Sequence, residues 1–257
     1  MAKFEKANSV GEWLEQRLNI KALNKVMMTE YWIPKDINFL WAMGVLLATT
    51  FTILVISGLF LMMYYKPDIN LAFDSVNYTI MQEVAFGWLF RHIHGVAASV
   101  IFLIIYIHML TGIYYGSYKQ GREMIWISGM LLFVTFSAAG FSGYMLPWGQ
   151  MSYWAAMVIT NLFGGVPVIG DALVVWIRGD FNVADATLTR FFMLHVFLLP
   201  IAIMGLIGLH FYTLRIPHVN NQSSEDIDFD AEAEKYLREI KKSQKLFLSG
   251  LYLSQKI

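Results

Sequence analysis

Four long apolar segments follow one another along the chain and are separated by polar ones. They run over residues 39–65, 93–115, 125–146 and 191–214. Each is long enough to cross a bilayer, which takes about 20 apolar residues in a helix. Because irregular backbone in contact with lipid leaves hydrogen-bonding groups unsatisfied, helices are the expected structure. The pattern predicts an all-α membrane protein with a bundle of four transmembrane helices, here called the first to the fourth span.

The sequence between the third and fourth spans predicts a short helical hairpin. Two apolar stretches, 151–163 and 172–177, are separated by the turn-forming run Gly-Gly-Val-Pro at 164–167. Glycine and proline in such a cluster are typical of a turn between helices. We expect this hairpin to lie at the membrane surface.

The two ends of the chain are more polar than the spans. Residues 1–36 mix apolar side chains such as Trp13 and Leu18 with scattered charges, which predicts an amphipathic helix on the membrane surface. Residues 219–257 carry an acidic and then a basic run, which is typical of a solvated tail or linker. The expected organisation is a surface segment over 1–36, a transmembrane domain over 37–218, and a polar tail over 219–257.

Composition narrows the class of protein. Only 15% of the 257 residues are charged, whereas about a quarter is usual for a soluble domain. The net charge is zero, so nothing in the bulk electrostatics predicts binding to nucleic acid. Cysteine is absent, which excludes disulfides, thiolate metal ligands, iron–sulfur ligation and thioether-linked haem within this sequence.

The distribution of Lys and Arg predicts the orientation in the membrane. Fifteen of the 19 lie in residues 1–36, in 119–122, or from Arg215 onwards. With four spans, these positions share one side of the membrane, and positive residues are enriched on the cytoplasmic side. We expect a multi-pass protein of the bacterial inner (cytoplasmic) membrane, with both termini in the cytoplasm.

Four histidines form two spaced pairs on the second and fourth spans. His94 and His108 are 14 residues apart, and His195 and His210 are 15 apart. Four helical turns take about 14.4 residues and rise about 21 Å, so each pair lies on one face of its helix. Both spans enter from the outer side, so His94 faces His195 near that surface and His108 faces His210 near the inner one. Each facing pair can supply the two axial ligands of one haem iron, which predicts two b haems.

A single histidine within a membrane is more often a hydrogen-bonded polar group or part of a proton relay than a ligand. Four histidines in two matching pairs favour ligation. His92 and His218 lie at the ends of spans, outside this spacing, and we interpret both as interfacial residues.

Glycines on the other two spans repeat the histidine spacing. A flat macrocycle can approach the backbone closely where no side chain is present, although small residues also favour helix–helix packing. The candidate haem-packing glycines are Gly44 and Gly58 on the first span and Gly129 and Gly143 on the third.

Two arginines, Arg91 and Arg190, precede the outer histidines by three and five residues. A guanidinium binds carboxylates well, so both are candidates for the propionates of a haem. The alternative is an interfacial arginine that extends its side chain towards water. The spacing does not decide between these two interpretations.

Several motifs resemble the cytochrome b family of respiratory and photosynthetic bc complexes. They comprise residues 86–94 and 114–118, the run Gly-Tyr-Met-Leu-Pro-Trp-Gly-Gln-Met-Ser at 143–152, and Ala-Thr-Leu-Thr-Arg-Phe-Phe at 186–192. The most specific is Pro-Trp-Gly-Gln-Met-Ser-Tyr-Trp at 147–154. The similarity covers roughly residues 35–218.

The resemblance implies a function. In this family a low-potential haem b lies near the outer face, with His94 and His195 at the matching ligand positions. A high-potential haem b lies near the inner face, at His108 and His210. Quinol is oxidised at an outer site, and one electron passes to a Rieske iron–sulfur protein and then to a c-type cytochrome. The other crosses both haems to reduce quinone at an inner site, in a proton-translocating Q cycle within a homodimeric complex.

The resemblance also implies residues for the two quinone sites. The outer site would be lined by Phe141, Tyr144, Met145, Ala155 and Ile159. Apolar and aromatic content suits a quinol pocket, although the same residues would serve ordinary docking of the hairpin on the bundle. Arg215, five residues after His210, is a candidate for an inner quinone oxygen or a propionate, or an ordinary anchor on the positive side.

The sequence departs from the family in four ways. The 15-residue spacing and Arg215 resemble the plastid type, but the cysteine that attaches an extra haem there is absent, so two haems are expected. Thr111 stands where the family has an arginine, which puts one propionate contact in doubt. Ala155 stands where mitochondrial proteins often have glycine, so we expect weak binding of methoxyacrylate-type inhibitors.

The fourth departure is length, because a full cytochrome b has about twice as many spans. The second-half Pro-Glu-(Trp/Phe)-Tyr loop, whose glutamate helps to deprotonate quinol, is absent from this sequence. Either a separate polypeptide for the C-terminal half supplies it or the sequence is a fragment. We therefore expect a subunit of a quinol–cytochrome c oxidoreductase that binds haem but does not complete catalysis alone.

Two other functions fit parts of the pattern. Di-haem membrane anchors of formate dehydrogenases or hydrogenases also use bis-histidine haems but lack the Pro-Trp-Gly-Gln run. A transporter with a histidine proton relay would bind no haem and show no visible absorption.

Overall fold

The four apolar segments form long helices in the computed structural model, which describes residues 9–12, 38–119, 121–215 and 238. The first span consists of the 3-10 helix η2 (Phe39–Ala42) and α3 (Met43–Met62). The second and third are α5 (Gly87–Tyr114) and α6 (Glu123–Met145). The fourth consists of α9 (Asp185–Met193), η5 (Leu194–Leu198) and α10 (Leu199–Arg215). The prediction of an all-helical bundle with four spans is therefore confirmed.

The outer surfaces of the spans are apolar. Val45 on α3 is 67% exposed, and Leu103 on α5 and Val134 on α6 are each 61% exposed. So many large apolar side chains on helix surfaces would be unfavourable in water but suit a hydrocarbon solvent. The chain is an integral membrane protein.

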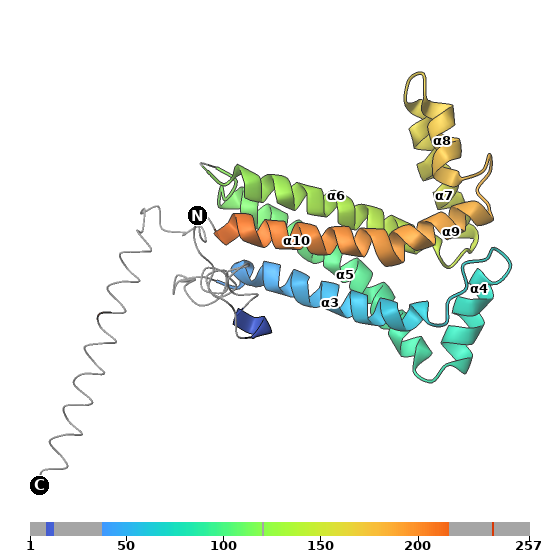
Figure 1. Cartoon of the computed structure of the whole chain (residues 1–257), viewed down its shortest axis with the longest axis horizontal. Coiled ribbons are helices and arrows are strands. Elements are labelled where there is room, and N and C mark those ends of the chain that lie inside the picture. The colour runs from blue at the N-terminus through green and yellow to red at the C-terminus, as the bar shows by residue number, and fades with distance from the viewer. Residues whose placement is uncertain (1–8, 13–37, 120, 216–237, 239–257) are drawn as a thin grey trace, which may run out of the picture. The chain divides into compact units, whose positions relative to one another are not determined.

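Within residues 38–214, one of two units into which the chain divides, the spans run alongside one another (Figure 1). α3 packs against α5, and α6 packs against α9 and η5. The connection between α3 and α5 and the hairpin between α6 and α9 lie at one end of the bundle, and the α5–α6 turn lies at the other (Figure 1). The remaining unit comprises Met1–Ile37 and Arg215–Ile257. Apart from residues 9–12 and 238, the predicted surface helix and polar tail lie outside the described residues.

The connection between the first two spans contains helices that the sequence did not predict. They are the short α4 (Ala72–Asp74) and the π-helix η3 (Ser75–Glu83), which packs on α5. Before them, the Tyr65 hydroxyl donates a hydrogen bond of 2.7 Å to the carbonyl of Leu146, just after α6. Burial raises the pKa of Tyr65, so this phenol stays protonated and remains a donor.

The expected hairpin between the third and fourth spans is present. It consists of α7 (Gln150–Leu162), the 3-10 turn η4 (Phe163–Gly165) and α8 (Gly170–Arg178). A Cβ at Gly170 would collide with the backbone of Gly164, so this turn requires glycine.

A buried arginine holds the hairpin together. Arg178 is only 5% exposed, and its Nε donates to the hydroxyl of Thr160 on α7 at 2.8 Å. Its terminal nitrogens donate to Oδ1 of Asn161 at 2.8 Å and to the carbonyl of Phe181 at 3.1 Å. Since buried polar groups are costly unless they are hydrogen-bonded, these contacts fix α7 against the end of α8 and the loop that follows it.

Candidate functional site

Two pairs of imidazoles face each other across the bundle. His94 on α5 lies opposite His195 on η5, with ring centroids 6.1 Å apart and ring planes at 80°. His108 on α5 lies opposite His210 on α10, with centroids 6.4 Å apart and planes at 72°. Two imidazoles bound on opposite sides of one metal ion by bonds of about 2.0 Å have centroids roughly 6 Å apart. Each pair is therefore spaced to hold one metal atom between its rings.

A π-helical turn explains why the two helices differ in histidine spacing. His195 lies in η5, between the α-helical segments α9 and α10. A π turn holds one more residue than an α turn, so 15 residues on this span correspond to 14 on α5. Pro200 follows the turn and has no N–H to donate to the carbonyl of Val196, which accounts for the irregularity at this point.

Each of the four spaced glycines lies against one imidazole. A Cβ at Gly58 would lie 3.1 Å from Cε1 of His94, and a Cβ at Gly143 would overlap the ring of His195. On the inner side, a Cβ at Gly129 would lie 3.3 Å from Cε1 of His210, and one at Gly44 would lie 3.9 Å from Cε1 of His108. The absence of side chains thus lets the imidazoles approach α3 and α6 closely. Packing of a macrocycle on these glycines stays a prediction.

Sequence reasoning missed the serines that precede three of these glycines. Ser57, Ser128 and Ser142 are at most 2% exposed. The hydroxyls of Ser57 and Ser128 lie 2.9 Å from Nδ1 of His94 and His210, respectively. The available signal was the Ser-Gly dipeptide, which occurs at 57–58, 128–129 and 142–143.

Nδ1 of His195 has a different partner. It lies 2.9 Å from the backbone carbonyl of Ala139, and the hydroxyl of Ser142 is 3.4 Å away. Histidines that ligate metals commonly donate their other ring nitrogen to such an acceptor.

The number of protein ligands favours haem over a bare metal ion. In the described part of the chain, no group of three or more His, Cys, Asp or Glu side chains converges on one point. Structural zinc takes four protein ligands, whereas a bis-histidine haem needs only two because the macrocycle supplies the others. The facing imidazoles and the side-chain-free surfaces behind them therefore fit haem b.

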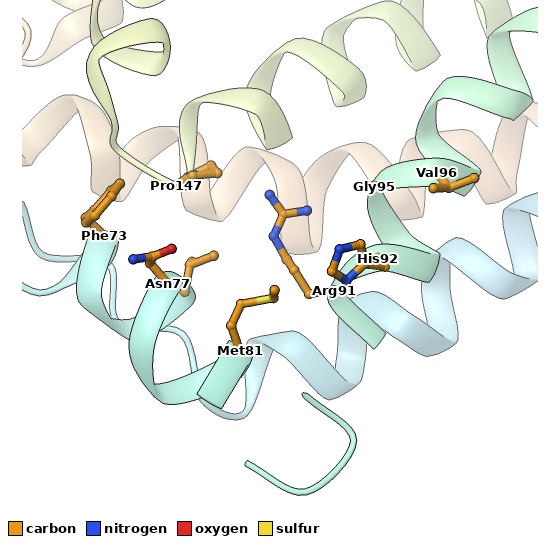
Figure 2. Close-up of a pocket in the computed structure, with 9 residues that line it drawn as sticks. Phe73, Asn77, Met81, Arg91, His92, Gly95, Val96 and Pro147 are labelled. Carbon is orange, nitrogen blue, oxygen red and sulfur yellow. The ribbon is translucent and has the colours of Figure 1, made fainter. Parts of the chain in front are cut away.

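Arg91, three residues before His94, points into a cavity of about 430 Å³ (Figure 2). The guanidinium of Arg91 lies among mostly apolar walls in this cavity. Such a cavity would suit a larger apolar molecule that carries an acidic group. Its lining residues are Phe73, Val76, Asn77, Met81, Arg91, His92, Gly95, Val96 and Pro147.

Neighbouring His92 is exposed, and its Nδ1 donates to the carbonyl of Trp88 at 2.7 Å within its own helix. In the described part of the chain, the ring of His92 is not paired with another histidine ring, whereas His94, two residues later, faces His195.

Arg190 makes a different contact from Arg91. Its guanidinium donates to the carbonyl of Trp176 on α8 and lies where a Cβ of Gly179 would be. Gly179 has a positive φ of 79°, which suits glycine and brings the end of α8 against Arg190. The structure thus shows Arg190 joining α9 to α8, and its propionate contact stays a prediction.

The residues predicted for the outer quinol site lie on the end of α6 and on α7. Met145 is fully buried in a cluster that includes Phe191, and the Phe141 ring meets Phe191 edge-on at 5.8 Å. Tyr144 is exposed, whereas Ala155 and Ile159 on α7 are half-buried. At the opposite end of the bundle, Arg215 is the last residue of α10.

Comparison with known proteins identifies relatives over most of the chain. The family model described as Cytochrome b/b6/petB matches residues 28–217. The chain is 45% identical over 216 residues to a cytochrome b of Allochromatium vinosum, covering 84% of this chain and 51% of that protein. It is also 42% identical to a "Cytochrome b/c1" of Bradyrhizobium diazoefficiens, covering 85% of this chain and 31% of that protein.

A solved structure described as a hyperthermophilic respiratory Complex III has a similar fold. It superposes with a TM-score of 0.72 at 35% identity, covering 89% of this chain and 65% of that one. The chain spans about half the length of the cytochrome b relatives that it matches.

Proposed function

Because the chain belongs to the cytochrome b family, and so to an electron-transferring oxidoreductase of the bc type, we propose that it carries electrons across the membrane through two b haems in a quinol-oxidising complex. The observation that supports this most directly is the pair of facing imidazole sets, with ring centroids 6.1 and 6.4 Å apart. Each haem, when bound, would accept and donate one electron at a time.

The chain's residues have distinct roles in this proposal. His94 and His195 would hold the outer haem, and His108 and His210 would hold the inner one. Arg91 binds a propionate of the outer haem in the cavity beside α5. Helix rise places the two sites about 21 Å apart along the bundle, so together they connect its two ends.

The family is the basis for what we propose about the wider complex. Quinol is oxidised at the outer side, beside Tyr144, Ala155 and Ile159, and quinone is reduced at the inner side, where Arg215 lies. A Rieske iron–sulfur protein and a c-type cytochrome accept the other electron of the Q cycle. The Complex III-like neighbour supports such partners. A second polypeptide, or a further part of the same one, supplies the C-terminal half, and the whole is a homodimer in a bacterial inner membrane.

A redox-titrated visible spectrum of the purified chain in detergent tests the central claim. We expect b-type absorption that titrates as two one-electron components, because the two imidazole pairs lie at different depths and in different surroundings. A colourless preparation, or a single component at one haem per chain, would contradict the proposal. A chain that showed two b haems but never assembled with a Rieske protein would support a di-haem anchor instead.

The half-buried Ala155 on α7 gives a further prediction about the outer site in the assembled complex. Replacing Ala155 with glycine removes a methyl group from a packed surface, and overpacking by such a group costs about 1–3 kcal/mol. We expect Ala155→Gly to lower the methoxyacrylate concentration for half-inhibition by roughly tenfold. Val158→Ala is a matched control because Val158, on the same helix, is 60% exposed. Tight binding by the unsubstituted complex would show this interpretation of Ala155 to be wrong.

A further inference from the structure

Three of the four facing imidazoles have a hydrogen-bond partner for Nδ1. The partners are the hydroxyl of Ser57 for His94, the hydroxyl of Ser128 for His210, and the carbonyl of Ala139 for His195, each at 2.9 Å. All three partners belong to α3 or α6, the helices that carry the spaced glycines. The glycine lets the imidazole approach the helix, and an oxygen of the same helix then accepts a hydrogen bond from its Nδ1–H.

The other contacts of the partners favour Nδ1–H as the donor in each of these hydrogen bonds. The Ala139 carbonyl can only accept. The hydroxyl proton of Ser57 is donated to the carbonyl of Ile53 at 2.7 Å, and that of Ser128 to the carbonyl of Ile125 at 3.0 Å. Both serine oxygens are therefore free to accept from Nδ1–H. This arrangement selects the tautomer in which Nε2 carries the lone pair for the metal.

His108 differs from the other three. In the part of the chain that the structure describes, no hydrogen bond joins its ring to another group, and the residue before Gly44 is Met43 instead of serine. Met43 is 2% exposed, and its thioether is at most a weak acceptor. The outer pair therefore has two imidazoles with Nδ1 acceptors, whereas the inner pair has one.

We propose that these Nδ1 acceptors set the outer haem to a lower reduction potential than the inner haem. Ser57 and Ser128 act as positioning residues, and the inner pair lacks one acceptor because Met43 stands where a serine would supply it. The inference rests on the proposed function, because it requires haem at both pairs. An imidazole that donates from Nδ1 is a more basic ligand and stabilises the oxidised iron. With haem bound, this difference in potential would favour electron transfer from the outer site to the inner site.

Site-selective shifts in midpoint potential test this proposal on the full chain with haem bound. Ser57→Ala should raise the potential of the outer haem alone, and Ser128→Ala that of the inner haem alone. Each should change the ratio of oxidised to reduced haem at a fixed ambient potential by roughly tenfold, which for one electron is about 59 mV. Met43→Ser, which supplies the missing hydroxyl, should lower the inner potential. The component lost in a His195→Ala variant identifies the outer haem.

Two controls separate tuning from general loosening of the bundle. Ser137→Ala removes another hydroxyl of α6, which donates to the carbonyl of Phe133. Within the described residues this hydroxyl has no hydrogen bond to a histidine, so the substitution should shift neither potential. Ser57→Thr retains an acceptor and should stay close to the unsubstituted protein.

Haem content separates a failure of this tuning from a failure of the proposed function. If both haems are present in Ser57→Ala and Ser128→Ala and their potentials are unchanged, the tuning is wrong while the proposed function stands. Equal shifts of both haems by a single substitution would also overturn it. If the unsubstituted chain binds no haem, the proposed function fails and this inference fails with it.

Discussion

Replacing His195 with alanine is expected to remove the outer haem and to leave the inner haem in place. His195 faces His94 at 6.1 Å between ring centroids, and among the paired rings it is the only partner across that site. The macrocycle of a b haem has no covalent link to the protein, so losing one of the two histidines that would hold the iron would remove half of the proposed protein–iron bonds. The inner pair is about 21 Å away along the bundle and shares neither ligand with the outer one.

The measurement is the haem content per chain together with a redox titration. We expect the content to fall from two haems to one, with loss of the component of lower potential. Met193→Ala is the matched control, since Met193 lies two residues before His195 and is 53% exposed. If His195→Ala kept both components, or Met193→Ala lost one, the assignment of ligands would be wrong.

The spans were predictable because each depends only on a run of apolar residues. The ends of the spans were less predictable. For example, α5 begins at Gly87, six residues before the start of the apolar run at residue 93. Gly87 follows Phe86, which has a left-handed φ of 60°, and a Cβ at Gly87 would overlap the carbonyl of Ile80. This boundary is therefore set by a close contact with η3, which no hydropathy pattern contains.

The facing of the histidines was also predictable, because spacing along a helix fixes both depth and direction. The π turn at His195 could not be predicted. A spacing of 15 residues is close enough to the about 14.4 residues of four α-helical turns that a regular α-helix already explains it. The hydroxyl partners were hidden for another reason. Ser57 lies 37 residues from His94 and Ser128 lies 82 residues from His210, so only the packing of the spans brings them together.

The glycine behind His195 is expected to be the most sensitive of the four to substitution. Gly143→Ala places a Cβ within the volume of the imidazole, so the ring or the helix must move. Overpacking of this kind costs about 1–3 kcal/mol, enough to weaken outer haem binding by roughly 5- to 150-fold. Haem content and the signal of the outer component measure the effect.

The other glycines provide a graded test of the same geometry. Gly58→Ala and Gly129→Ala, with Cβ distances of 3.1 and 3.3 Å, should have smaller effects, and Gly44→Ala, at 3.9 Å, should keep its haem. Gly205→Ala is the control for adding a methyl group to a span, because nothing lies within 4 Å of its Cβ. There the greater helix propensity of alanine should, if anything, stabilise α10. Equal haem loss in Gly44→Ala and Gly143→Ala would contradict this geometry. It would mean that these glycines act on the macrocycle or on helix packing, and not through the imidazoles that they contact.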